Sequence, residues 1–509
     1  MSDDQADRVP ASLVDLLFGD AVAGAVGAAD DQADESALLV HAAGVDHSLG
    51  EVRRRATDIA GALADAGVAA GAPVGVMLPD PEVVAALFGV WRAGGVYVPL
   101  NPRLARGDLA HVLTSVEPAV VVTVDEHVDR FGDRPLVVVG ADRIVHRPGT
   151  VGERRFDSEV ALVQFTSGTT GRPKPVLLTH DGVRQLLENV ITTLRTRPTG
   201  GPAKPPMPNL IPVSLSLWAG IYQVLFARLV GAPVVVMDGF DPHEFADLVA
   251  RFGIRSTVLP PAAMTMLSDA TDITSLAPLK YVRSITAPLS PLQARRFRDR
   301  FGLAVLNGYG QTEIGGEIIG WSGADAREHG DDKLGAVGRP HPGVEVRSEA
   351  GTGELQVRTP SMSAGYADGA DLSDRLTADG WFRTGDVGVV DGDGFVWIDG
   401  RLGDMINRGG LKVFPGEVEE VLRLAPDVAD VAVAGVPDER LGEVPVAFVV
   451  AAAGAAPDPA ALAALCREHL APYKVPVRFE AVPALPRNEV GKVLVRELTA
   501  GRPTADRQL

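Results

Sequence analysis

Short runs of Val, Ile and Leu alternate with longer segments of helical periodicity through most of the first 400 residues. The short runs predict buried strands, and the longer segments, which begin with proline, predict helices. Since uninterrupted apolar strands are typical of parallel sheets covered on both faces, this part is expected to be α/β. Predicted strands cover residues 74–78, 97–100, 119–124, 135–139, 232–237 and 256–259, and predicted helices cover residues 81–93 and 242–252.

The pattern changes after about residue 335, where glycine and aspartate become frequent and predict tight turns, as in Asp391-Gly-Asp-Gly394. From Phe414 onward helices and strands alternate again. The predicted elements here are a strand at 395–398, helices at 415–423 and 459–470, and strands at 428–436 and 444–452. The fold class is therefore predicted to be α/β, with a large N-terminal part of parallel-rich sheets and helices, a β-rich part, and a small α/β unit at the end.

The composition excludes several classes of protein. The chain has 509 residues, 46% of them hydrophobic, which is enough for several domains and a large packed core. Lys and Arg number 48 against 66 Asp and Glu, a net charge of −18. An acidic surface repels phosphate backbones and anionic lipids, so no nucleic-acid polymer and no membrane is expected as a partner. A local basic pocket for a nucleotide remains compatible with this charge.

Three features of the sequence bear on the cellular location of the protein. The one cysteine, Cys466, excludes an intrachain disulfide framework and is expected to be buried. The acidic N-terminus lacks the basic and apolar regions of a signal peptide. The longest uncharged run, residues 205–227, contains four prolines and is not expected to span a bilayer. A cytoplasmic location is therefore expected.

The strongest local signal for chemistry is the string Phe-Thr-Ser-Gly-Thr-Thr-Gly-Arg-Pro-Lys at residues 165–174. Successive glycine and hydroxyl residues leave backbone N–H groups free to surround phosphate oxygens, and Lys174 adds a positive charge. The spacing is not that of a Walker loop. The string therefore predicts a phosphate-binding loop of another kind.

This string resembles the phosphate loop of the adenylate-forming superfamily, which includes acyl- and aryl-CoA synthetases, peptide-synthetase adenylation domains and firefly luciferase. Further segments resemble the other motifs of that superfamily in its order: residues 307–313 (Asn-Gly-Tyr-Gly-Gln-Thr-Glu), 335–340, 353–358, 381–386, 400–412 and 486–492. The resemblance covers residues 35–500 and is closest in look to free-standing acyl- and aryl-CoA ligases. It implies an N-terminal AMP-binding domain over residues 1–402 and a small mobile α/β domain over residues 403–509.

The resemblance also implies a role for each matching residue in binding ATP and Mg²⁺. Lys492 would bridge the carboxylate and the α-phosphate, Thr312 would contact the α-phosphate, and Glu313 would bind Mg²⁺. These roles suit a reaction in which negative charge spreads over phosphate oxygens. The residues implied to bind ATP are Thr166, Ser167, Gly168, Thr169, Thr170, Gly171, Lys174, Asn307, Gly308, Tyr309 against adenine, Gly310, Asp386 at both ribose hydroxyls, and Arg401 at the same sugar.

For the second half-reaction the resemblance implies a rotation of the C-terminal domain about a hinge at Gly403. The rotation would present Gly409 and Gly410 to an incoming thiol, with Lys412 on the pantetheine path or at the acyl substrate. The implied acid pocket is mostly apolar and favours an aromatic or medium-chain acid. Its residues are Leu215, Trp218, Ile221, Tyr222, Thr286, Gly308 and Gly315.

Four positions depart from the superfamily pattern. Pro175 follows Lys174 where glycine is usual, and Gly403 stands at the hinge where Asp or Lys is common. Leu215 stands where CoA ligases often have histidine, and Thr286 replaces a pocket glycine. These departures are read either as ordinary drift or as signs of an unusual acid or acceptor.

The leading functional hypothesis is an AMP-forming acid–CoA ligase that uses ATP, Mg²⁺, CoA and a carboxylic acid. The first alternative keeps adenylation but changes the acceptor to an amine or a carrier-protein thiol, or activates nitrite for diazotisation of an aryl amine. The second alternative is a nucleotide-binding pseudoenzyme. Retention of Lys174, Glu313, Asp386, Arg401 and Lys492 together argues against that last reading.

Overall fold

The computed structural model describes residues 12–19, 34–141, 143–166, 173–194, 206–487 and 493–499. The chain divides into two compact units, each described by itself below. Unit 1 comprises Met1–Glu345 and Arg358–Leu376, and unit 2 comprises Val346–Val357 and Thr377–Leu509. Unit 2 therefore takes in most of the predicted β-rich part as well as the predicted C-terminal domain. The domain boundary at residue 402 remains a prediction.

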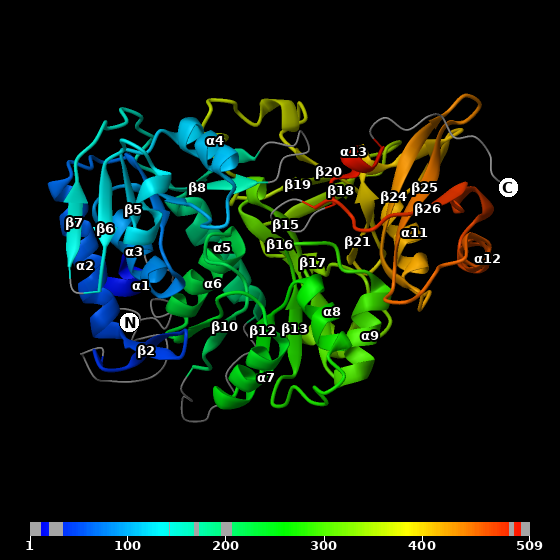
Figure 1. Ribbon diagram of the computed structural model, residues 1–509, viewed down its shortest axis with the longest axis horizontal. Helices are drawn as coiled ribbons and strands as arrows, with labels where there is room; N and C mark the ends of the chain where they lie inside the picture. Colours follow the sequence, from blue (N-terminus) through cyan, green and yellow to red (C-terminus); the bar gives the residue numbers. More distant parts are fainter. Residues whose placement is uncertain are drawn as a thin grey trace. The chain divides into compact units, whose positions relative to one another are not determined.

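The largest sheet in the described part of unit 1 has the strand order β7-β6-β5-β3-β4-β8-β9. Its interior pairings are parallel, and β7 and β9 pair antiparallel at the two edges. Helix α4 packs on one face, and helices α2 and α3 contact the strands they cover (Figure 1). The bounds are β3 Pro73–Met77, β4 Val96–Pro99, β5 Val120–Thr123, β6 Leu136–Val139, β7 Ile144–Arg147, β8 Val160–Thr166, β9 Lys174–Thr179, α2 Leu49–Asp65, α3 Asp80–Arg92 and α4 Arg106–Val116.

Three smaller sheets complete the described part of unit 1: β10-β11-β1-β2, the parallel β12-β13-β14, and the antiparallel β15-β16-β17. Helices α7, α8 and α9 pack around β13 through Phe245, Met264 and Phe297. The strand bounds are β1 Leu38–Ala42, β2 Val45–Ser48, β10 Asn209–Ile211, β11 Val234–Val236, β12 Ser256–Val258, β13 Tyr281–Ser284, β14 Ala304–Asn307, β15 Tyr309–Gln311, β16 Gly316–Gly320 and β17 Arg339–Pro340. The helix bounds are α1 Asp15–Phe18, α5 His180–Leu194, α6 Trp218–Leu229, α7 Pro242–Arg251, α8 Pro261–Asp269, α9 Pro291–Phe301 and α10 Gly323–His329.

Unit 2 contains the sheet β18-β19-β20-β21 and the sheet β23-β22-β25-β24, in which β26 also pairs with β25. Alternate residues of β24 face opposite ways, so Val431 and Val433 pack under α11 and α12, whereas Ala432 packs with Leu498 of α13. The bounds are β18 Glu345–Ser348, β19 Glu354–Arg358, β20 Phe382–Val390, β21 Val396–Arg401, β22 Ile406–Arg408, β23 Leu411–Val413, β24 Val428–Asp438, β25 Gly442–Ala451, β26 Arg478–Ala481, α11 Pro415–Leu422, α12 Pro459–His469 and α13 Val495–Thr499.

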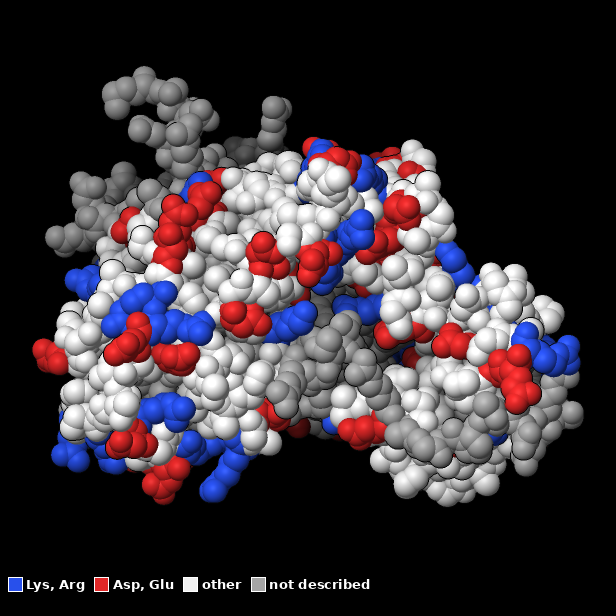
Figure 2. All heavy atoms as spheres, turned by 90° about the horizontal axis from the view of Figure 1, so that it is seen from above, with Lys and Arg blue, Asp and Glu red and all other residues white. Residues whose placement is uncertain are grey.

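The structure confirms the α/β fold class and each strand and helix predicted from the hydrophobic pattern. Cys466 is buried in the core of unit 2, and this burial raises the pKa of its thiol to about 11. None of the described helices is long and apolar enough to cross a bilayer. On the face drawn in Figure 2, basic and acidic side chains are interspersed rather than gathered by sign.

Candidate active site

The predicted phosphate loop joins two antiparallel strands of unit 1. β8 ends at Thr166, which pairs in register with Lys174, the first residue of β9. The Thr166 hydroxyl donates a hydrogen bond to the Lys174 carbonyl oxygen at 3.5 Å. Pro175 lies in β9 and accepts from the Ala367 backbone N–H at 2.7 Å, so proline is tolerated at the loop exit. The loop residues Ser167, Gly168, Thr169, Thr170 and Gly171 lie outside the described residues, and their role stays a prediction.

Tyr366 lies between two of the predicted site residues. The Lys174 ammonium is 5.4 Å from the centroid of the Tyr366 ring, and the Tyr366 hydroxyl donates to Glu313 Oε1 at 3.5 Å. Burial raises the pKa of Tyr366, and the Glu313 carboxylate raises it further. The structure thus brings the loop lysine and the carboxylate of the predicted magnesium motif together around an aromatic ring. Sequence reasoning missed Tyr366, since it stands alone among small residues and matches no chemical motif.

The backbone on both sides of Tyr366 is held between β9 and the Glu313 turn. The Ser363 N–H donates to the Glu313 carbonyl oxygen at 2.9 Å, and the Ser361 hydroxyl donates to the Ile314 carbonyl oxygen at 2.8 Å. On the β9 side, the Leu177 N–H donates to the Gly365 carbonyl oxygen at 2.9 Å. These bonds fix where the Tyr366 side chain begins.

The predicted adenine and magnesium motif follows β14. Asn307 ends that strand, Tyr309 and Gly310 lie in β15, and Thr312 and Glu313 lie in the short 3₁₀ helix Thr312–Ile314. Only glycine fits at position 310, because a Cβ there would lie 1.7 Å from the Gly316 carbonyl oxygen. The close approach brings the start of β16 against the motif.

The surroundings of Glu313 fit a magnesium ion whose ligands come mainly from the phosphates of a bound nucleotide. Among the described residues, no group of three His, Cys, Asp or Glu side chains could hold a metal alone. Mg²⁺ commonly takes only one or two carboxylates and fills its other positions with phosphate oxygens and water. A single carboxylate at Glu313 therefore fits a Mg²⁺ ion bound together with the phosphates of ATP.

The predicted acid-pocket residues of α6 meet the end of this motif. The buried Trp218 indole N–H donates to the Gly315 carbonyl oxygen at 2.7 Å. Tyr222 lies one helical turn further along, with its ring 6.1 Å from that of Trp218. Leu215, just before α6, and Ile221, within α6, are both buried. The structure therefore groups Trp218, Tyr222 and Gly315, three of the predicted acid-pocket residues.

Thr286 stands in an unusual backbone conformation. It follows β13, is exposed, and has a φ of 75°. This left-handed region favours glycine and is unusual for a β-branched residue. The conformation suits the glycine that the resemblance implies at this position, and it marks Thr286 as a strained position in this chain.

Sequence reasoning missed a largely buried ion pair that joins two sheets of unit 1. Arg283 of β13 donates to Glu317 of β16, and their side chains are only 13% and 11% exposed. Burial alone would raise the pKa of Glu317, but Arg283 and then His341 outweigh it, and the pKa falls to about 2. A signal existed in the sequence, since Glu317 is the one charge in the otherwise uncharged run 314–321.

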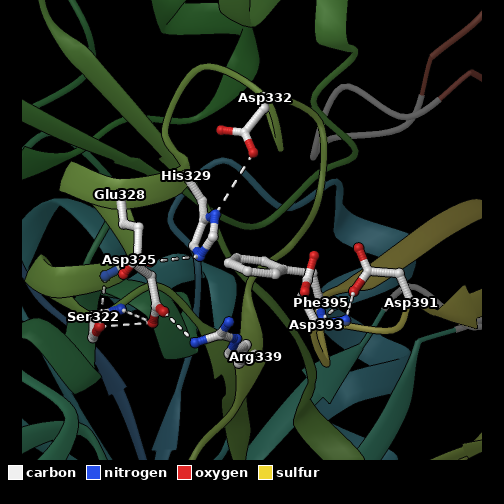
Figure 3. A network of polar contacts seen from close by, with 9 residues as sticks. All are labelled: Ser322, Asp325, Glu328, His329, Asp332, Arg339, Asp391, Asp393 and Phe395. Carbon is white, nitrogen blue, oxygen red and sulfur yellow. Dashed lines mark hydrogen bonds and ion pairs between the residues drawn. The ribbon is translucent and has the colours of Figure 1, made fainter.

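The segment that contains His341 is anchored through α10. The helix begins with a capping box in which Ser322 and Asp325 bind each other, and Asp325 also pairs with Arg339 at 2.6 Å (Figure 3). Arg339 opens β17, whose next residue, Pro340, pairs with Ile319 of β16. The predicted motif at 335–340 therefore fixes the chain just before His341.

Unit 2 carries the predicted ribose residues. Asp386 of β20 and Arg401 of β21 are paired in register, and their side chains form an ion pair at 3.2 Å. Asp386 is buried and Arg401 is 43% exposed. The turn between these strands is the predicted Asp-Gly-Asp-Gly sequence, in which Asp391 accepts from the backbone N–H groups of Asp393 and Phe395 (Figure 3).

The predicted hinge and thiol path also lie in unit 2. Gly403 is exposed, and nothing lies within 4 Å of the position that a Cβ would take there. Gly409 and Gly410 form the exposed turn between β22 and β23, with φ values of 60° and 90°. Lys412 of β23 donates to the Thr352 carbonyl oxygen at 2.8 Å. Lys492 lies outside the described residues, so its role remains a prediction.

Comparison with known proteins places these features in a family. Residues 27–367 match the family of AMP-binding enzymes, and residues 417–492 match the AMP-binding enzyme C-terminal domain. A feruloyl-CoA synthase from Amycolatopsis sp. is 32% identical over 491 residues, covering 90% of this chain and 95% of that protein.

Two solved structures are similar over nearly their whole length. The ATP-bound MatB from Rhodopseudomonas palustris superposes with a TM-score of 0.81 at 27% identity, covering 96% of this chain and 98% of the other. The amide bond synthetase McbA from Marinactinospora thermotolerans superposes with a TM-score of 0.79, also at 27% identity and with the same coverage. The similar proteins thus include both a CoA synthase and an amide synthetase.

Proposed function

Because this chain belongs to the AMP-binding, adenylate-forming family of enzymes, we propose that it is an acid–CoA ligase that works in two steps. In the first step the substrate carboxylate attacks the α-phosphorus of ATP, and the bond to pyrophosphate breaks. In the second step the thiol of CoA attacks the acyl carbon, loses its proton, and AMP leaves. The product is an acyl-CoA.

The convergence of Lys174, Tyr366 and Glu313 is the observation that supports the adenylation step best. Negative charge spreads over the phosphate oxygens as pyrophosphate leaves, and a fixed cation nearby stabilises it. Lys174 would supply that charge, and Glu313 would hold a magnesium ion, which would neutralise part of the phosphate charge. Tyr366 contacts both groups, the lysine through its ring and the carboxylate through its hydroxyl.

Other residues bind and orient the reactants. The Asp386 carboxylate accepts hydrogen bonds from the ribose hydroxyls, and Arg401, paired with it, reaches the same sugar. Thr312 and Lys492 contact the α-phosphate, and Lys492 also contacts the attacking carboxylate. Holding both reactants in line lowers the activation barrier, because much of their translational and rotational freedom is already lost on binding.

The mobile C-terminal domain is part of the same proposal. Gly403 has open space around its backbone and leads toward the exposed turn at Gly409 and Gly410, which supports a hinge and a thiol path there. A hinge needs a few residues that absorb a large change in backbone angles, and glycine does so at low cost. After rotation Lys412 would exchange its contact with Thr352 for one to the acyl substrate or pantetheine.

A different acceptor is the second candidate. The chain is similar over at least nine tenths of its length both to an amide bond synthetase and to a feruloyl-CoA synthase. In addition, Gly403, Leu215 and Thr286 depart from the usual CoA-ligase residues. The acceptor would then be an amine or a carrier-protein thiol, or nitrite would take the place of the acid.

The deciding experiment is mass spectrometry of the purified protein with ATP, Mg²⁺ and a pool of aryl, fatty and small acids plus nitrite. Each reaction is run with CoA, with an amine, and with neither. An acyl-CoA that appears only with CoA supports the ligase. Amide formation without CoA, or AMP formation without any thioester, overturns the CoA step in favour of the second candidate. Absence of pyrophosphate release with every acid overturns adenylation itself.

A further inference from the structure

The short turn that carries Glu313 is held through its backbone more than through the Glu313 carboxylate. Among the described residues, that carboxylate accepts one hydrogen bond, the long one of 3.5 Å from Tyr366. A side chain with a single weak contact depends on its backbone for its position. The way in which the turn at residues 312–315 is held therefore decides where the Glu313 carboxylate lies.

Every backbone carbonyl of this turn has a hydrogen-bond donor. The Thr312 carbonyl oxygen accepts from the Gly315 N–H inside the turn at 3.0 Å. The next three carbonyl oxygens accept from donors outside the turn: Glu313 from the Ser363 N–H at 2.9 Å, Ile314 from the Ser361 hydroxyl at 2.8 Å, and Gly315 from the Trp218 indole N–H at 2.7 Å. We call these three outside donors the carbonyl clamp.

The carbonyl clamp closes on the turn from two distant parts of unit 1. Trp218 is the first residue of α6, whereas Ser361 and Ser363 lie in the segment after β19. Two glycines let these groups approach. A Cβ on Gly315 would lie 2.5 Å from the Ser361 carbonyl oxygen. A Cβ on Gly316 would lie 2.9 Å from the indole nitrogen of Trp218, so the turn is closely packed on both sides.

Both side-chain donors of the carbonyl clamp are buried, since Ser361 is 1% exposed and Trp218 is 8% exposed. Water therefore does not replace a donor that is removed, and the carbonyl oxygen it served is left unpaired. The turn would then be stabilised by a shift toward another donor. Such a shift would displace the Glu313 carboxylate, because its own contact with Tyr366 is weak.

We propose that Trp218 and Ser361 are positioning residues, which hold the Glu313 carboxylate where it binds the magnesium ion of a Mg²⁺–ATP complex. The proposal rests on the adenylation function proposed above. Groups that orient a metal ligand commonly affect metal affinity although they do not touch the metal. This role of Trp218 is separate from its predicted place in the acid pocket, because it uses the indole N–H and not the face of the ring.

The test measures how strongly Mg²⁺ increases the affinity for ATP. Isothermal titration calorimetry gives the Kd of ATP with excess Mg²⁺ and with EDTA, and the ratio of the two constants is the magnesium enhancement. No acid is added, so neither turnover nor the acid pocket contributes. Glu313→Gln should lower the enhancement furthest. Trp218→Phe keeps a ring but removes the N–H, and it should lower the enhancement by about fivefold, the effect of one buried hydrogen bond.

Further variants assign the effect to the turn. Ser361→Ala should lower the enhancement in the same way, and it tests the carbonyl clamp even if the tryptophan variant does not fold. Trp91→Phe is the matched control, since the buried Trp91 indole N–H donates to the Ala161 carbonyl oxygen of β8 at 2.8 Å. It should leave the enhancement unchanged. When Glu313→Gln is already present, Trp218→Phe should have no further effect, because positioning acts through the Glu313 carboxylate.

The outcomes separate this proposal from the proposed function. If Trp218→Phe and Ser361→Ala keep the native enhancement, even with reduced stability or weaker ATP binding in both conditions, the clamp is merely structural and the proposal is overturned. An equal fall in Trp91→Phe would show a general loss of packing and would overturn it too. An enhancement that does not depend on Glu313 removes that carboxylate from the metal site. If the native protein binds no ATP, adenylation fails and this proposal fails with it.

Discussion

The two arginine–carboxylate pairs of the candidate site differ in how they are built. Asp386 and Arg401 face each other on neighbouring strands of unit 2, and the arginine remains 43% exposed. Arg283 and Glu317 come from different sheets of unit 1, and both side chains are nearly buried. The first pair is open to a ligand, whereas the second pair is enclosed by protein. We therefore expect the exposed pair to act mainly in binding and the enclosed pair to contribute to the stability of the fold.

The largest expected effect comes from breaking the buried pair. Glu317→Ala should lower the free energy of unfolding by about 3–5 kcal/mol, because it leaves the Arg283 charge buried and uncompensated. Denaturant unfolding followed by tryptophan fluorescence measures the change. The double variant Arg283→Met with Glu317→Leu removes both charges and should recover most of the loss. If the single variant unfolds at the same denaturant concentration as the native protein, the structural role of this pair is contradicted.

Substitution of a predicted ATP-contacting residue should change the rate of adenylation rather than the stability of the protein. Lys492→Ala is expected to slow adenylation by about 10²–10³, the effect of losing one preorganised contact to the transition state. Acid-dependent pyrophosphate release measures it, and Lys280→Ala, an exposed lysine of unit 1, is the control. An unchanged rate of AMP formation in Lys492→Ala would remove this residue from the mechanism.

Acid should weaken the buried pair in a defined range of pH. The pKa of Glu317 is about 2 in the folded protein against an ordinary 4.5, so the folded state holds its proton less tightly than the unfolded state. Its stabilisation is complete above pH 4.5 and is lost as the pH falls toward 2, by about 3 kcal/mol in total.

The comparison with Glu317→Gln isolates this effect from other carboxylates. The difference in unfolding free energy between the native protein and this variant should shrink between pH 4.5 and 2. Glu345→Gln, at an exposed carboxylate, should show no such trend. A difference that is constant with pH would mean that the pKa of Glu317 is not lowered.

The exposed pair should show the opposite balance of effects. Arg401→Ala is expected to change the free energy of unfolding by less than about 1 kcal/mol, as is usual for exposed ion pairs. Its kcat/KM for ATP should fall by about tenfold or more, because a charged contact to the ribose is lost. A large loss of stability with unchanged ATP kinetics would reverse the distinction between the two pairs.

The smallest expected effect concerns Thr286, which adjoins the buried pair along the chain. Thr286→Gly should relieve the left-handed backbone strain and raise the free energy of unfolding by up to about 1 kcal/mol, since the greater chain entropy of glycine offsets part of the gain. Thr286→Ala keeps a Cβ and should gain less. Destabilisation by the glycine variant would show that the threonine side chain makes stabilising contacts that outweigh its strain.

The sequence by itself determined the α/β class, the individual strands and helices, and the family. A strand such as that at 119–124 can be predicted without knowing which distant residues pack against it, because a buried strand needs consecutive apolar side chains wherever it lies. The pairing of Asp386 with Arg401 follows almost as directly, since a short turn joins their strands. The motifs could be recognised for the same reason, as each is a continuous string of residues.

Only the tertiary structure decided which distant residues meet. Lys174, Glu313 and Tyr366 lie far apart in the chain and come together because the segment after residue 361 is held between β9 and the Glu313 turn. Arg283 of β13, Glu317 of β16 and His341, which follows β17, also meet, and no local pattern marks them as neighbours. The physical reason is that local preferences describe how each segment folds, whereas contacts between segments depend on how all of them pack together.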